Sequence, residues 1–171
     1  MLPRSSLQVR GEHSRQPAGN AIVRPVRRCR GADQWGIMDD IAEMLEAAGR
    51  ARDNAHAPYS GFAVGACLAS EDGRLFASCN VENAAYPQSQ CAEAGAIAAM
   101  VAAGGRRIAA VLVLAGGPAP CPPCGGCRQR LAEFAGPEVP VHLCDPAGGR
   151  KTVTLGELLP LAFTAASFRR P

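Results

Sequence analysis

The sequence predicts an α/β fold, a three-layer α-β-α domain built on a mixed five-stranded sheet. The expected order of elements, α-β-β-α-β-α-β-β-α, mixes helices with strands along the chain and disfavours a bundle or a barrel. Residues 108–115 form a nearly continuous aliphatic run, which is typical of a central strand covered on both faces. A length of 171 residues, with 47% hydrophobic and 19% charged residues, suits a single core.

The first 36 residues differ in composition from the rest. They hold seven of the eighteen Lys and Arg residues beside two acidic residues, and they show no apolar periodicity. We expect a disordered basic tail, because such a segment cannot bury enough surface to offset the entropy lost on ordering. A solvated tail, an organellar transit peptide and a mis-assigned start codon upstream of Met38 all remain open. The folded domain is expected at residues 37–171.

Charge and hydropathy limit the partners of the chain. The formal net charge is +3 and the tail alone carries +5, so residues 37–171 carry −2. Because this domain is a poor match for a polyanion, we expect no nucleic-acid partner. No run approaches the roughly 18 to 20 apolar residues of a membrane span, so we expect no membrane partner. Eight cysteines without a secretory signal indicate a reducing compartment, and we expect a cytoplasmic protein.

The first half of the domain is expected to contain one helix and a hairpin. Apolar residues repeat at i, i+3, i+4 and i+7, so a helix should begin at Ile37 and end before Pro58. Strands at 62–69 and 75–79 follow, and the Asp-Gly pair between them has the chemistry of a hairpin turn. A polar loop at 80–90 then leads to the next helix.

The second half is expected to alternate helices and strands. An Ala-rich segment followed by Gly104-Gly105 predicts a helix with a glycine stop, and Thr154 is a suitable N-cap for the final helix. The expected elements are a helix at 91–103, a strand at 108–115, a helix at about 124–134, strands at 139–144 and 151–154, and a last helix from about Leu155. This order implies helices on the faces of the sheet.

Two cysteine motifs stand where a loop turns into an expected helix. Cys91 opens one helix, and Cys124 and Cys127 lie at the start of another. Zinc binds thiolates in a tetrahedral site, and a catalytic zinc keeps three protein ligands so that water can take the fourth position. The free amides and positive ends of two helices can offset the net negative charge of three thiolates on Zn²⁺. The pattern predicts a catalytic zinc site at Cys91, Cys124 and Cys127.

Glu93 lies two residues after Cys91, where its carboxylate can face the zinc-bound water without ligating the metal. Zinc lowers the pKa of such a water to about 7, and a carboxylate beside it can act as a general acid and base. A Cys-Ala-Glu motif followed by Pro-Cys-x-x-Cys is typical of zinc deaminases, which attack C4 of cytosine or C6 of adenine. Glu93 is therefore the candidate catalytic residue.

Other interpretations of the cysteines remain open. Cys121 stands three residues before Cys124 and leaves ambiguous which pair binds metal, although the helix start and the Pro-Cys-Gly context favour Cys124 and Cys127. An iron–sulfur run would need a fourth cysteine after three intervening residues, but Arg130 and Leu131 stand there. A redox Cys-x-x-Cys would need no Cys-Ala-Glu partner, and a purely structural zinc would call for a fourth protein ligand.

The remaining cysteines and histidines of the domain are expected to be structural. Cys67, Cys79 and Cys144 fall in expected strands, where a free cysteine usually behaves as a small buried hydrophobe. His56 precedes a turn and His142 lies in a strand, and neither has the companions of a metal ligand.

Five segments of the chain resemble the short-chain cytidine deaminase family. They are residues 57–66 (APYSGFAVGA), 80–87 (NVENAAYP), 91–93 (CAE), 123–129 (PCGGCRQ) and 157–163 (ELLPLAF). They follow the family order through almost all of residues 38–165, and five motifs in order are far more specific than one. The resemblance implies the fold of that family and a Zn²⁺ cofactor. It also implies hydrolytic deamination of free cytidine and 2′-deoxycytidine to the uridine products, with release of ammonia, in pyrimidine salvage.

The resemblance also implies which residues contact the substrate. It places Phe62 on the pyrimidine ring, Asn80 and Glu82 on the ribose hydroxyls, and Ala92 among the substrate-binding residues. It also implies a homotetramer, in which a neighbouring subunit contributes Ala84, Tyr86 and Phe163 to the same pocket. The residue pattern agrees for Asn80 and Glu82, because side chains two positions apart on an extended segment point the same way and can bond vicinal hydroxyls.

The chain departs from the family pattern at Ala94, where many members resemble each other in carrying an arginine that hydrogen-bonds the zinc thiolates. Without that arginine the bound water should be less acidic, unless Arg128 or the helix ends compensate.

Two rival enzyme functions share the zinc motifs. A deaminase of a modified nucleoside such as blasticidin S is disfavoured by Asn80 and Glu82, which suit a ribose. A nucleic-acid editing deaminase would need a basic, aromatic-lined channel, and 5% of the chain is aromatic.

Overall fold

A mixed five-stranded sheet forms the centre of the computed structural model, which describes residues 37–117 and 119–168. The strands are β1 (Val64–Ser70), β2 (Leu75–Cys79), β3 (Ile108–Ala115), β4 (Pro140–Cys144) and β5 (Arg150–Thr154). Their order across the sheet is β2-β1-β3-β4-β5, with β3 and β4 parallel and the other neighbours antiparallel. The prediction of a mixed sheet with residues 108–115 at its centre is confirmed.

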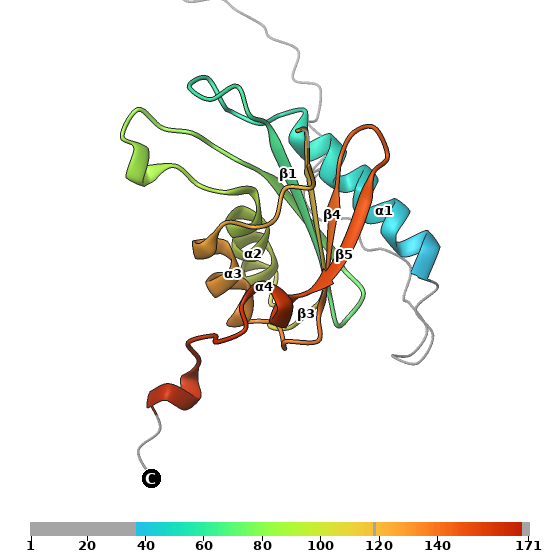
Figure 1. The fold of residues 1–171 in the computed structure, drawn as a ribbon, viewed down its shortest axis with the longest axis vertical. Helices are drawn as coiled ribbons and strands as arrows, with labels where there is room; N and C mark the ends of the chain where they lie inside the picture. The colour runs from blue at the N-terminus through green and yellow to red at the C-terminus, as the bar shows by residue number, and fades with distance from the viewer. Residues whose placement is uncertain (1–36, 118, 169–171) are drawn as a thin grey trace, which may run out of the picture.

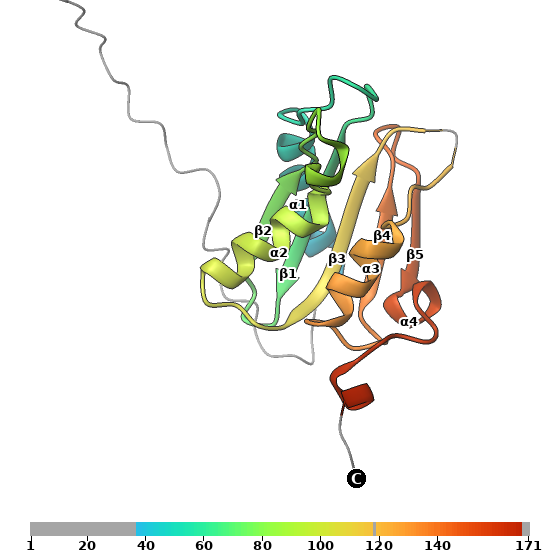
Figure 2. The ribbon, with the colours of Figure 1, turned by 90° about the vertical axis from the view of Figure 1, so that its left-hand side faces the viewer.

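Helices cover both faces of this sheet (Figure 1, Figure 2). They are α1 (Ile37–Arg52), α2 (Ala92–Ala102), α3 (Gly125–Ala132) and the short α4 (Leu155–Leu158). α1 lies on one face, whereas α2, α3 and α4 lie on the other. The predicted three-layer α-β-α architecture is therefore confirmed.

The central strand β3 separates the two halves of the core. Val111 and Val113 belong to the hydrophobic cluster under α2, α3 and α4. Leu112 and Leu114 belong to the cluster under α1, together with Met44. Because side chains alternate along a strand, a strand covered on both faces buries nearly all of them, which accounts for the continuous aliphatic run.

β1 begins at Val64, not at residue 62 as predicted. The Asn80 side chain bonds both sides of this step: its Nδ2 donates to the Phe62 carbonyl at 2.9 Å, and its Oδ1 accepts from the Val64 amide at 2.8 Å. A side chain therefore takes the place of strand pairing here, and Phe62 lies in a loop.

Other element boundaries differ from the predictions by a turn or less. Two 3₁₀ turns, Tyr86–Gln88 and Ala165–Phe168, are additional, and α3 ends at Ala132 instead of near 134. The expected N-cap of α4 is confirmed, because the Thr154 hydroxyl accepts from the Glu157 amide at 3.2 Å. The Glu157 carboxylate in turn accepts from the Thr154 amide at 2.6 Å, which completes a capping box.

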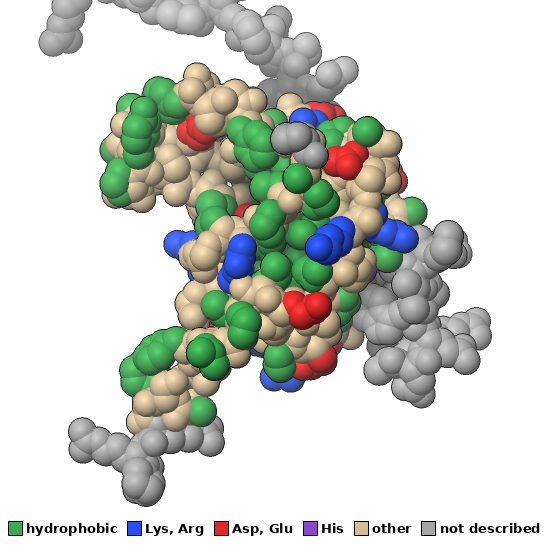
Figure 3. Space-filling view, viewed as in Figure 1, with side chains coloured by type: hydrophobic (Ala, Val, Ile, Leu, Met, Phe, Trp, Pro, Cys, Tyr) green, Lys and Arg blue, Asp and Glu red, His purple; other side chains and the backbone are tan. Residues whose placement is uncertain are grey.

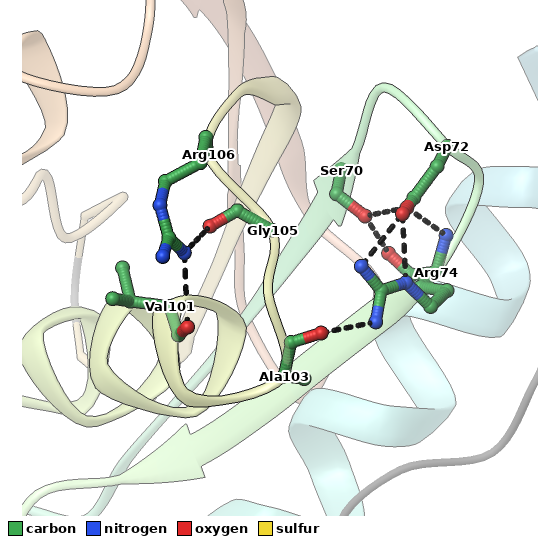
Figure 4. Close-up of polar contacts among 7 residues, drawn as sticks. All are labelled: Ser70, Asp72, Arg74, Val101, Ala103, Gly105 and Arg106. Atoms are coloured by element: carbon green, nitrogen blue, oxygen red, sulfur yellow. Dashed lines mark hydrogen bonds and ion pairs between the residues drawn. The ribbon is translucent and has the colours of Figure 1, made fainter.

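The β1–β2 hairpin is fastened to the C-terminal end of α2 (Figure 4). Arg74 Nη1 donates to the Ala103 carbonyl at 2.8 Å, and its Nε donates to the Asp72 carboxylate at 2.8 Å. Arg106 Nη1 donates to the Val101 carbonyl at 3.0 Å. Arg74 thus satisfies a carbonyl at the end of the helix, and Arg106 adds a second donor to the Val101 carbonyl, which also accepts from the Gly104 amide at 3.0 Å.

Part of the predicted organisation lies outside the described residues. The expected tail at 1–36 and its three interpretations stay predictions, as does the extension of the domain to residue 171. Within the described ranges, no helix is both long and apolar enough to cross a membrane.

Candidate metal centre

The parallel pair β3 and β4 places two helix starts at one edge of the sheet. α2 leads by a short connection into β3, and α3 leads into β4, so both helices begin near the carboxyl ends of these strands. Cys91 is the N-cap residue of α2, Cys124 is the N-cap residue of α3, and Cys127 lies in the first turn of α3. The topology therefore brings together cysteines that are distant in sequence.

The three predicted ligands meet in space. The sulfur atoms of Cys91, Cys124 and Cys127 all lie within 4.8 Å of one another, and the Sγ atoms of Cys91 and Cys124 are 3.7 Å apart. A tetrahedral zinc with Zn–S bonds of about 2.3 Å requires sulfur atoms about 3.8 Å apart. The sulfur of Cys121 is not part of this group and contacts the Pro122 carbonyl at 3.8 Å. The geometry therefore favours Cys124 and Cys127 as the ligand pair.

The helix starts suit bound thiolates. Cys91 and Cys124 have extended backbone conformations, and neither helix start is closed by a side-chain cap hydrogen bond. First-turn amides without a backbone partner can therefore bond a sulfur, as the Cys127 amide bonds that of Cys124. Burial raises the pKa of the Cys124 thiol, but hydrogen bonds from the Cys127 backbone and from the two neighbouring thiols outweigh burial, so the pKa of Cys124 is lowered.

The other two thiols resist ionisation in the absence of a cation. Burial raises the pKa of Cys91, and burial together with the negative charge of Glu93 raises the pKa of Cys127. Three thiolates and a carboxylate at this spacing repel one another, and a divalent cation removes that repulsion. The donor set therefore fits zinc.

Glu93 is the charged group buried beside these sulfurs. It occupies the first turn of α2 and is 4% exposed. Its negative charge contributes to raising the pKa of Cys91, Cys121 and Cys127, which places the carboxylate close to the thiols. Within residues 37–117 and 119–168, no hydrogen bond or ion pair engages this carboxylate. A buried carboxylate without a fixed partner can exchange protons with a bound molecule.

The neighbours of Glu93 are small. Ala92 is fully buried, and Ala94 is half-buried. No arginine or lysine of the described part of the chain donates a hydrogen bond to Cys91, Cys124 or Cys127. Arg128 does not compensate by contacting a sulfur, because its Nε and Nη1 atoms donate to the backbone.

The two predicted ribose contacts organise a loop that sequence reasoning did not connect to them. The Glu82 carboxylate accepts from the amides of Tyr59 at 2.8 Å and Ser60 at 3.2 Å, and from the Ser60 hydroxyl. The Ser60 hydroxyl and the two amides lower the pKa of Glu82. Gly61, with a φ of 67°, completes the turn. Glu82, like Asn80, therefore holds the loop that carries Phe62, and its contact with ribose stays a prediction.

The residues predicted to complete a neighbouring pocket are exposed on this single chain. Tyr86 is 70% exposed and packs edge-on against Tyr59, and Phe163 is 58% exposed and packs edge-on against Phe168. Ala84 is exposed as well. Figure 3 shows a notch between the lobe formed by the projecting loops and the body of the domain, whereas the C-terminal segment runs away from the body in Figure 1.

The residues expected to be structural lie outside the sulfur group, although His56 among them is exposed. Cys67 and Cys144 are buried, and Cys79 is half-buried. Burial lowers the pKa of His142, whose Nδ1 lies 2.9 Å from the Thr152 hydroxyl. None of them belongs to the sulfur group among the described residues.

Known proteins share this combination of fold and motifs. A family model described as the cytidine and deoxycytidylate deaminase zinc-binding region matches residues 38–143. A cytidine deaminase of Sporosarcina psychrophila is 41% identical over 125 residues, which are 73% of this chain and 92% of that protein. A cytidine deaminase of Halalkalibacterium halodurans is 41% identical over 126 residues, which are 74% of this chain and 96% of that protein.

Solved structures are similar in fold as well. The crystal structure of cytidine deaminase from Burkholderia pseudomallei has a TM-score of 0.68 and 44% identity, and the match covers 71% of this chain and 98% of that chain. The crystal structure of cytidine deaminase from Mycobacterium tuberculosis has a TM-score of 0.64 and 38% identity, and the match covers 73% of this chain and 98% of that chain. The described part of the chain thus matches nearly the whole length of these proteins.

Proposed function

The chain belongs to the cytidine and deoxycytidylate deaminase family, and we propose that it hydrolyses the 4-amino group of free cytidine and 2′-deoxycytidine. Water adds to C4 of the ring, the bond from C4 to the amino nitrogen breaks, and uridine or 2′-deoxyuridine and ammonia are released. The observation that carries this conclusion is the group of three cysteine sulfurs within 4.8 Å of one another, with the buried Glu93 beside them.

Cys91, Cys124 and Cys127 would hold the zinc ion. When bound, zinc supplies a Lewis acid that activates a water molecule near neutral pH. The two helix starts keep the thiolates oriented, because each N-cap cysteine is part of a regular turn. The free amides at those helix starts stabilise the negative charge of the sulfurs.

Glu93 would move the protons. Its buried carboxylate accepts a proton from the attacking water and delivers it to N3 of the pyrimidine. It then carries the second proton to the amino nitrogen, which leaves as ammonia. This shuttle requires a carboxylate with no competing partner, and Glu93 has none among the described residues.

The loop that carries Phe62 would bind the nucleoside. Phe62 would pack on the ring, and its 41% exposure leaves a face free for stacking. Glu82 and Asn80 would bond the ribose hydroxyls through the remaining lone pairs and the remaining amide proton of their side chains. Ala92, fully buried in the first turn of α2, leaves room for the ring beside Glu93.

A homotetramer would complete this pocket. Large apolar side chains are exposed on the isolated chain, and burying them is favourable. They are Tyr59, Phe62, Val81, Tyr86, Leu161, Phe163 and Phe168. Ala84, Tyr86 and Phe163 would line the pocket of an adjacent subunit. The exposed fraction of Leu161, 95%, supports an interface at the C-terminal segment.

A reducing compartment would suit the centre. All seven described cysteines are free thiols, and oxidation of a ligand sulfur would prevent it from binding metal. We therefore place the enzyme in the cytoplasm, where salvage of pyrimidine nucleosides would use its product.

The test is an ultraviolet assay on cytidine, 2′-deoxycytidine and blasticidin S with zinc quantified in the same samples. Glu93→Gln should keep its zinc and lose turnover by about 10²- to 10⁴-fold, because the amide cannot carry a proton. Glu133→Gln, an exposed carboxylate at the C-cap of α3, is the matched control and should leave turnover unchanged. Full turnover in Glu93→Gln, or no deamination of cytidine by the zinc-loaded parent protein, would contradict the proposal.

A further inference from the structure

We infer that Arg128 and Gln129, two consecutive residues of α3, act as a clasp that positions the ligand Cys124 and anchors the C-terminal segment to α3. The inference rests on the proposed zinc deaminase function and adds two positioning residues to it. Neither side chain contacts a sulfur, so both act through the backbone that they bond.

Arg128 fixes the peptide unit that carries Cys124. Its Nε donates to the Pro123 carbonyl at 2.8 Å, and its backbone amide donates to the Cys124 carbonyl at 3.0 Å. Pro123 is fully buried, so its carbonyl has little access to water as an alternative partner. The Pro123 carbonyl and the Cα of Cys124 belong to one planar peptide unit. A hydrogen bond to that carbonyl therefore orients the atom from which the Cys124 sulfur projects.

The same guanidinium also reaches the C-terminal segment. Arg128 Nη1 donates to the carbonyl of Leu158, the last residue of α4, at 3.0 Å. Gln129 Nε2 donates to the Phe163 carbonyl at 2.7 Å. Carbonyls at and beyond a helix end have no helical partner, so side chains of α3 supply one. The segment that carries Phe163 is thus anchored at two points to the helix that begins at Cys124.

The positioning of Cys124 by this clasp is more important in a chain that has Ala94. The family resemblance places at this position an arginine that bonds the thiolates directly, and here no basic side chain of the described residues does so. The orientation of Cys124 therefore depends on its backbone restraints. Removing a group that orients a metal ligand typically weakens metal affinity by 10- to 100-fold.

The first test removes the Arg128 contacts from the zinc-loaded full-length protein. Arg128→Gln should weaken zinc affinity about tenfold in a chelator competition, and Arg128→Lys should lose less, because lysine keeps one donor and the charge. Cobalt-substituted Arg128→Lys should show altered sulfur-to-cobalt absorption. Arg130→Gln, an exposed arginine of the same helix whose side chain makes no hydrogen bond among the described residues, is the control. Parental zinc affinity and cobalt spectra in both Arg128 variants would overturn the inference.

The second test separates the two arms of the clasp. Gln129→Ala frees the Phe163 carbonyl without touching Pro123, so it should leave zinc affinity and kcat unchanged and raise KM for cytidine about threefold. Amide exchange of residues 159–168 should become faster in this variant. Unchanged KM and unchanged amide exchange would overturn the role of Gln129 in holding the C-terminal segment.

Zinc affinity and exchange are measured without substrate, so they remain informative if the parental protein binds zinc but does not deaminate cytidine. In that case the proposed function fails and the clasp is still tested. Arg128→Lys keeps the aliphatic stem and the charge, and a melting temperature equal to that of the parent shows that its zinc loss is not due to unfolding.

Discussion

At the scale of single residues, the Ser60 hydroxyl links the sugar side and the ring side of the proposed pocket. It donates to the Glu82 carboxylate and accepts from the Phe62 amide at 3.0 Å. The charge of Glu82 and the position of Phe62 are thereby coupled through one oxygen atom. Ser60 lies in a motif of the family resemblance but was not among the predicted contacts, because its role depends on a bond to a residue 22 positions away.

We predict that Ser60→Ala raises KM for cytidine by about threefold to tenfold with little change in kcat, because the loop loses a bond to a charged group remote from the reacting atoms. Steady-state kinetics of the zinc-loaded protein measure this. Ser60→Thr retains the hydroxyl and should behave like the parent. A fall in kcat at constant KM would show that Ser60 acts elsewhere.

At the scale of elements, the contact of α1 with β1 depends on a glycine. A Cβ added to Gly65 would lie 2.0 Å from the Ala48 carbonyl oxygen and 2.9 Å from the Arg52 Cβ. The helix therefore rests directly on the strand backbone. Gly49, the residue after Ala48 on the same helix, has space, because the nearest atom to its added Cβ is Leu114 Cδ2 at 3.8 Å.

Gly65→Ala and Gly49→Ala should therefore change stability in opposite directions. We expect Gly65→Ala to destabilise the fold by about 2 kcal/mol, because α1 must move away from the sheet. Gly49→Ala should stabilise it by up to about 1 kcal/mol, because alanine favours the helix. Denaturant unfolding of both variants measures the difference, and equal effects would contradict the close approach of α1 to β1.

At the scale of the whole molecule, the exposed aromatic side chains support the proposal that a second subunit completes the pocket. Phe163 and Phe168 pack on each other and otherwise face solvent. The C-terminal segment that carries them is held at its base by α3 and extends from the body (Figure 1). A segment that is anchored at its base and apolar along its length suits contact with a second subunit.

Subunit sharing predicts complementation between two impaired variants. Glu93→Gln lacks the proposed proton shuttle, and Phe163→Ala lacks the proposed contribution to the adjacent pocket. Mixed assemblies pair an intact Glu93 with an intact Phe163 from a neighbour, so co-refolded protein should be more active than either variant alone. Light scattering checks the tetramer. Activity no higher than the average of the separate variants would contradict a shared pocket.

Local pattern accounts for most of the predicted fold. The Asp-Gly turn placed β2, and the continuous aliphatic run placed β3, at their observed bounds, because those signals act over a few residues. The predicted start of β1 was wrong, because the Asn80 side chain bonds the backbone on both sides of Ala63 and replaces strand pairing. The turn at Tyr86–Gln88 was missed, because a polar loop with one proline does not distinguish a 3₁₀ turn from irregular backbone.

The sequence by itself determined the identity of the chemical groups, the helix starts that carry them and the resemblance to a zinc deaminase. Only the tertiary structure decided that Cys91 meets Cys124 and Cys127, that Cys121 stands outside this group, and that Arg128 bonds the backbone instead of a sulfur. The physical reason is the distance along the chain over which each signal acts. Propensities and caps depend on neighbours along the chain, whereas the meeting of two helix starts depends on the parallel pairing of β3 with β4.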